Sequence, residues 1–182
     1  SRAPEDINLI NVGDREFDDH FIFDGSLKDQ NDFVIRSKAD RNVQVSENIE
    51  WLTDEMKTNK YSGLPRLPGH VCAGMRNLVD NVPLKFFKKI PLDGKGRLCD
   101  EKSAKEHVEV SVGAFSVTMY RNVKRNKIYV RPDNYININV VVVRENNPPE
   151  GRDRIEWVLY TSLPVATIEQ IEVVVRIYEL RW

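Results

Sequence analysis

Tyr178 and Arg181 lie three residues apart near the end of the sequence, so a helix would place both side chains on one face. A carboxylate at position 185 would share that face, because it would lie seven residues from Tyr178. A guanidinium forks onto phosphate oxygens, and a phenol adds a hydrogen bond. The spacing suits a grip on a phosphate beside a metal, although an ordinary amphipathic helix shows the same pattern.

Asp14 follows a short, largely apolar run at residues 7–12 and then Gly13. This order predicts a carboxylate just beyond the C-terminal end of a strand. Sites in α/β sheets are assembled at such ends, and hard carboxylate oxygens suit Mg²⁺. An acid in this position also commonly caps the next helix. Asp14 alone therefore leaves a metal ligand and a helix cap as open alternatives.

Two kinds of hydrophobic periodicity predict the helices and strands that would position these residues. Helical spacing over 16–30, between strand-like runs at 7–12 and 33–38, predicts an α/β opening of strand, helix and strand. From Val108 the period changes to two, which predicts an antiparallel β segment. Its expected strands cover residues 108–112, 115–119, 136–142 and, after a break at 146–151, 155–163.

Thr167 and Gln170 have the spacing of a capping box, which predicts a helix starting at this point. Its expected buried stripe is Ile168, Ile171, Val174, Val175 and Tyr178. The helical pattern continues to the last residue without a stop signal, so we expect a segment cut from a longer protein. Between the two halves, a short helix near 49–56 and an irregular stretch over 57–107 are predicted.

Charge is uneven although the net charge is -1. Residues 81–131 carry 12 basic and 5 acidic side chains, so this part could face phosphate. The two cysteines and three histidines show no zinc spacing, and no apolar run reaches the roughly 20 residues of a membrane span. These features predict a cytoplasmic protein with reduced thiols and no membrane partner.

Four blocks in order resemble the transposases of the bacterial insertion-sequence-four group, the Tn-five-like DDE enzymes. They are the run from Val12 to Glu16, the strand from Phe33 to Lys38, the break from Asn147 to Gly151 with the strand after it, and the terminal run from Ile177 to Trp182. The blocks frame most of the chain, whereas residues 39–107 match poorly.

The resemblance implies a mixed α/β (α+β) fold with a partial ribonuclease-H-like core and a largely antiparallel β insertion domain. Residues 1–40 would belong to the core and residues 41–163 to the insertion. Residues 164–182 would begin the core helix that leads to a catalytic Glu. That Glu and the family's following Lys would fall at positions 185 and 192, and the first Asp would lie upstream of Ser1.

The resemblance also implies roles for single residues. Asp14 matches the second carboxylate of the DDE triad and would be catalytic and a metal ligand, whereas Arg36, Lys38, Tyr178 and Arg181 would contact transposon-end DNA. Trp157 matches an aromatic on which a flipped base stacks. Such stacking returns about 1–3 kcal/mol. Its alternative is a core tryptophan on one strand face with Ile155 and Leu159.

Family members act as dimers that use two divalent ions, Mg²⁺ or Mn²⁺, held by three carboxylates, for phosphodiester hydrolysis and strand transfer. A single carboxylate does not hold two ions, so residues 1–182 alone are expected to bind no metal and to cleave no DNA. An alternative is a non-catalytic DNA-binding or assembly module derived from such an enzyme. In either case Lys124, Arg125 and Lys127, between two expected strands, are predicted phosphate contacts.

Overall fold

The fold opens with a parallel unit of strand, helix and strand. The computed structural model describes residues 8–38, 40–58, 66–93, 99, 101–120 and 135–181. Strands β1 (Ile10–Gly13) and β2 (Asp32–Arg36) pair in parallel, and α1 (His20–Lys28) connects them. Phe23 of α1 stacks on Phe33 of β2, with ring centroids 5.2 Å apart. The predicted α/β opening is confirmed, and the parallel pairing brings the C-terminal ends of β1 and β2 to the same edge.

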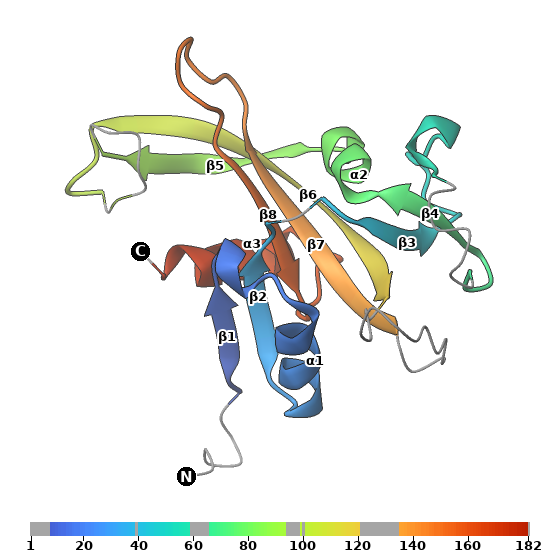
Figure 1. The fold of residues 1–182 in the computed structure, drawn as a ribbon. Helices are drawn as coiled ribbons and strands as arrows, with labels where there is room; N and C mark the ends of the chain where they lie inside the picture. The colour runs from blue at the N-terminus through green and yellow to red at the C-terminus, as the bar shows by residue number, and fades with distance from the viewer. Residues whose placement is uncertain are drawn as a thin grey trace.

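Antiparallel pairing extends this unit into one sheet, in the order β1-β2-β8-β7-β6-β3-β4, with β5 also paired to β6 (Figure 1). The added strands are β3 (Asn42–Ser46), β4 (His70–Gly74), β5 (Lys85–Leu92), β6 (Glu106–Tyr120), β7 (Tyr135–Glu145) and β8 (Glu156–Thr161). The expected strands 108–112 and 115–119 form one strand, β6. Gly113 allows this path, because a Cβ there would lie 2.6 Å from the Pro83 carbonyl oxygen.

Two apolar clusters cover opposite faces of the sheet. Phe23 and Phe33 belong to one cluster, together with Leu78 of α2 (Met75–Asn81). The other cluster packs against α3 (Ile168–Glu179). The run Val140–Val143 is buried on both faces, because alternate residues point to different clusters. The central strands are therefore covered by helices on both sides.

Several local expectations for residues 49–107 were wrong. A short 3-10 turn, Asp54–Met56, stands where a helix over 49–56 was expected. The supposedly irregular stretch contains β4, α2 and β5. Their strands are short or lie at an edge, so the alternation that marks β6 and β7 has little room to appear.

The N-terminus of α3 has the predicted capping box. Thr167 Oγ1 accepts a hydrogen bond from the Gln170 backbone N–H, and the Gln170 side chain accepts one from the Thr167 N–H. The predicted buried stripe is confirmed for Ile171, Val174, Val175 and Tyr178, whereas Ile168 is exposed. Ile168 is the first residue of the helix, next to the Thr167 cap, and its side chain lies outside the buried stripe.

The Thr167→Ala variant is expected to lower the free energy of unfolding by about 1 kcal/mol, because the cap satisfies backbone donors that no helical carbonyl reaches. Chemical unfolding measured by circular dichroism checks this value. Thr167→Ser keeps the hydroxyl and should retain most of the stability. An equal loss in both variants would mean that the methyl group, and not the cap, stabilises the helix.

The fold is a mixed α+β structure with a mostly antiparallel sheet and, among the described residues, three α-helices. Strands assigned to a core (β1, β2) and to an insertion (β3 to β8) share one hydrogen-bonded sheet. The ribonuclease-H-like core and the division at residues 40 and 163 stay predictions.

Candidate functional site

Asp14 lies immediately after β1, where the chain turns into the 3-10 segment Arg15–Phe17. Its Oδ1 accepts a hydrogen bond from the Arg15 backbone N–H at 2.8 Å, so Asp14 does cap a helical turn. Its Oδ2 accepts a second hydrogen bond from Arg181 Nη2 at 3.0 Å. Residues 167 positions apart in sequence therefore form an ion pair at the end of β1.

The pKa of Asp14 reflects several opposing effects. Partial burial raises it, whereas the hydrogen bonds from Arg181 and the Arg15 backbone and the charges of Arg181 and Arg36 lower it. The net result is a pKa below the ordinary value of 3.8. Asp14 is therefore ionised at neutral pH and offers a carboxylate beside two guanidinium groups.

Arg36 and Tyr178 complete this group. Arg36 ends β2, next to the end of β1, and its Nη2 donates to the Glu156 carbonyl oxygen at 3.2 Å. Tyr178 is fully buried, and burial raises its pKa, although the nearby charges of Arg36 and Arg181 act in the opposite direction. Its Oη makes no hydrogen bond of good geometry with the described residues. Asp14, Arg36, Tyr178 and Arg181, which we call the Asp14 cluster, thus lie together at the end of β1. The DNA contact expected of Tyr178 stays a prediction that requires its buried side chain to become accessible.

Trp157 is 4% exposed and belongs to the cluster of apolar residues that packs against α3. Its ring lies 5.4 Å from the ring of Tyr178. A ring that stacks on a flipped base must be accessible. The structure therefore favours the core alternative for Trp157, and the base-stacking role stays a prediction that requires the ring to become exposed.

Four further residues were predicted to contact DNA. Lys38 is exposed just after β2, and its backbone N–H donates to Asp18 Oδ2 at 2.7 Å. Lys124, Arg125 and Lys127 fall outside the described residues.

Arg181→Ala is expected to raise the pKa of Asp14 toward 3.8, because the variant removes the hydrogen bond and charge that lower it. A carboxyl group whose pKa is lower in the folded state stabilises the fold at pH values above its ordinary pKa. This stabilisation disappears as the pH falls through the folded-state pKa. The variant should therefore lose less stability than the wild type on acidification. Carbon-detected NMR titration of the carboxyl group checks the shift. Arg176→Ala, on the exposed face of the same helix, is the control, and an unchanged Asp14 pKa in Arg181→Ala contradicts the assignment.

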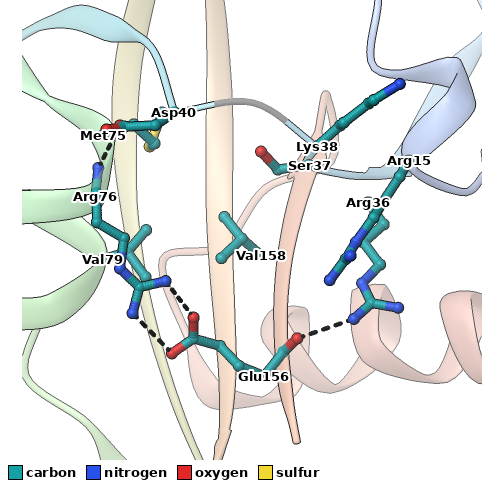
Figure 2. A pocket seen from close by; sticks show the side chains of 10 residues that line it. All are labelled: Arg15, Arg36, Ser37, Lys38, Asp40, Met75, Arg76, Val79, Glu156 and Val158. Atoms are coloured by element: carbon teal, nitrogen blue, oxygen red, sulfur yellow. Dashed lines mark hydrogen bonds and ion pairs between the residues drawn. The ribbon is translucent and has the colours of Figure 1, made fainter.

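An open pocket of about 280 Å³ adjoins the Asp14 cluster and shares Arg36 with it. Figure 2 shows Arg15, Arg36 and Lys38 on one side of this pocket, Val158 in the centre, and side chains of α2 opposite. The full lining is Arg15, Arg36, Ser37, Lys38, Asp40, Met75, Arg76, Val79, Glu156 and Val158. The sequence did not indicate a site at Arg15, Asp40, Arg76 or Glu156, since no motif joins these separate segments.

An ionic network holds the α2 side of the pocket. Arg76 pairs with Asp80 on the same helix and with Glu156 on β8. Arg144 Nε donates a hydrogen bond to Glu156 Oε2 at 2.9 Å. Burial opposes ionisation of Glu156, but hydrogen bonds and charge from Arg76 and then Arg144 lower its pKa overall. Asp40 Oδ1 accepts from the Arg76 backbone N–H at 3.0 Å. The α2 wall of the pocket is therefore fixed by charged contacts.

The Asp14 cluster can bind an anion with two guanidinium groups beside a carboxylate. Among the described residues, no three His, Cys, Asp or Glu side chains gather as a metal site would need. None of the helices in the described segments is long and apolar enough to span a membrane. No protein-family model matches the chain.

Proposed function

We propose that this chain is the central part of a bacterial DDE transposase of the insertion-sequence-four group, which performs phosphodiester hydrolysis and strand transfer at transposon ends. The observation that carries the proposal is the meeting of Asp14, Arg36, Tyr178 and Arg181 at one place. A second copy of the enzyme and transposon-end DNA are its proposed partners, in the bacterial cytoplasm.

Arg36 and Arg181 bind the DNA backbone in this proposal, since both guanidinium groups act on one small region around Asp14. Arg181 Nη2 lies 3.0 Å from Asp14 Oδ2 in an ion pair. A phosphate offers the same guanidinium a bidentate acceptor. DNA therefore competes with Asp14 for Arg181, and binding of the backbone frees the carboxylate.

Tyr178 has a positioning role. Its ring packs on Trp157 and is fully buried, so it fixes the last turn of α3 against the sheet. Arg181 lies one turn further along that helical path, and its backbone N–H donates to the Tyr178 carbonyl oxygen at 3.3 Å. Tyr178 thus holds Arg181 in reach of Asp14.

The described residues do not fit Mg²⁺ or Mn²⁺ by themselves, because Asp14 is the only carboxylate that the described segments place in the cluster and both of its oxygens accept hydrogen bonds. Further carboxylates must join Asp14 before the chemistry occurs. The second candidate function, a non-catalytic DNA-binding or assembly module, is favoured by this same isolation of Asp14.

The proposal is tested by incubating the proposed full-length enzyme with labelled transposon-end DNA, with and without Mg²⁺, and measuring cleavage. Asp14→Asn should abolish cleavage and retain DNA binding, whereas Asp29→Asn, an exposed acid after α1, should leave cleavage intact. Cleavage that survives Asp14→Asn contradicts the proposal. DNA binding without cleavage in the wild type supports the module instead.

A further inference from the structure

Three cations line one wall of the pocket beside the Asp14 cluster. Arg15, Arg36 and Lys38 come from the ends of β1 and β2, and Figure 2 shows their side chains on the same side. None of the three forms an ion pair within 4.0 Å with a carboxylate in the described part of the chain. Three cations without an ion-pair partner at contact distance attract an anion such as phosphate, and the Asp14 carboxylate near Arg36 offsets only part of their charge.

The opposite wall has different chemistry. Asp40 lies there, where its Oδ1 accepts a hydrogen bond from the Arg76 backbone N–H, and no described hydrogen bond reaches its Oδ2. Arg76 is already bound to Asp80 and Glu156, so its charge is neutralised. Between the walls lies the apolar side chain of Val158. A ligand that crosses the pocket meets cations, then an apolar surface, then a carboxylate.

The size of the pocket exceeds what a phosphate alone would fill. Its volume is about 280 Å³, which is near the lower end of small-molecule pockets, roughly 300 Å³. Because the pocket is open to solvent, a sugar and a base can extend from a phosphate held at its wall.

We propose that this pocket binds one nucleotide unit, with its phosphate on Arg15, Arg36 and Lys38 and its base across Val158. An exocyclic amino group of the base donates to Asp40, in the manner in which carboxylates accept from the cytosine amino group. Thymine carries a carbonyl oxygen at that position, which a carboxylate repels. The pocket therefore prefers amino bases. For a nucleotide within a DNA strand, this inference deepens the proposed function and rests on it. Binding of a free nucleotide would be independent of that function.

Calorimetric titration of residues 1–182 in EDTA tests the base preference. Deoxycytidine monophosphate should bind roughly 5- to 10-fold more tightly than thymidine monophosphate, and inorganic phosphate more weakly than both. Asp40→Asn should remove or reverse the preference, because an amide can donate to the thymine carbonyl. Equal affinity of wild type for the two nucleotides overturns the proposal.

Cation variants test the phosphate wall. Arg15→Ala and Lys38→Ala should each weaken binding of deoxycytidine monophosphate about 10-fold, because each removes a charge-assisted contact. Lys89→Ala, which removes an exposed lysine on β5, is the matched control and should bind as wild type does. Unchanged affinity in both pocket variants overturns the proposed orientation, and circular dichroism spectra exclude unfolding as the cause of a loss.

Titration with single-stranded oligonucleotides of deoxycytidine or of thymidine shows whether the pocket binds a nucleotide within DNA or a free nucleotide. Tighter binding of the strand with the same cytosine preference identifies a nucleotide within DNA, whereas preference in the free ligands alone identifies a free nucleotide. Neither outcome depends on metal, since EDTA is present. A failure of metal-dependent cleavage therefore leaves this test intact, and absent binding of all nucleotides overturns the pocket proposal alone.

Discussion

Replacing Trp157 with alanine is expected to lower the free energy of unfolding by about 3–5 kcal/mol, the usual effect of truncating a buried large aromatic. Trp157 is 4% exposed, packs on Tyr178 and lies in the cluster beneath α3. Truncation opens a cavity that the close-packed sheet and helix fill incompletely. Urea unfolding followed by circular dichroism measures the change.

A matched comparison separates the two interpretations of Trp157. Trp157→Phe keeps much of the packing and should lose clearly less stability than Trp157→Ala. Phe86→Ala removes an aromatic that is 59% exposed, so its effect should stay within about 0.5 kcal/mol. A Trp157→Ala protein as stable as wild type would contradict the core interpretation and leave base stacking as the better explanation.

The strands that could be predicted from sequence are those whose burial alternates or whose ends carry turn residues. β6 and β7 show period two over most of their length, and β1 and β2 flank a helical pattern. The capping box at Thr167 predicted the start of α3 because its two hydrogen bonds are local. Local chemistry and a regular period thus determine these elements.

The region from β3 to β5 could not be predicted, because its short strands derive their stability from neighbours far along the chain. β3 pairs with β4 and meets β6 through the pair Gln44 and Thr118. α2 has seven residues, which is too short for a periodic stripe to be evident. Long-range contacts decide these segments, and the sequence window around each one does not contain them.

The Asp14 cluster shows the same division. Tyr178 and Arg181 could be paired from helical spacing, but their approach to Asp14 depends on α3 packing beside β2. The alternation of the β8 strand showed that Trp157 and Leu159 share a face without showing whether that face is covered. Asp40, Arg15 and Arg76 come from segments with no shared motif, so their pocket becomes evident only in three dimensions.

Arg152→Met is expected to lower the free energy of unfolding by about 3 kcal/mol. Glu145, at the end of β7, has a side chain that is 1% exposed, and its carboxylate binds Arg152 Nη2 and the Ile155 backbone N–H. Removing the arginine leaves a buried carboxylate with one neutral donor, which costs about 3–5 kcal/mol for a fully buried pair. The lower end applies, because Arg152 is one quarter exposed and water partly replaces it.

Removing both charges distinguishes this desolvation effect from simple loss of contact. In the double variant Glu145→Leu with Arg152→Met no charge is left buried, so it should be more stable than Arg152→Met alone. Arg154→Met, which removes an exposed neighbouring arginine, is the control and should remain within about 0.5 kcal/mol of wild type. Thermal or urea unfolding of the four proteins gives the comparison. A double variant less stable than the single one would show that the pair itself, and not the avoidance of an unpaired carboxylate, secures the turn between β7 and β8.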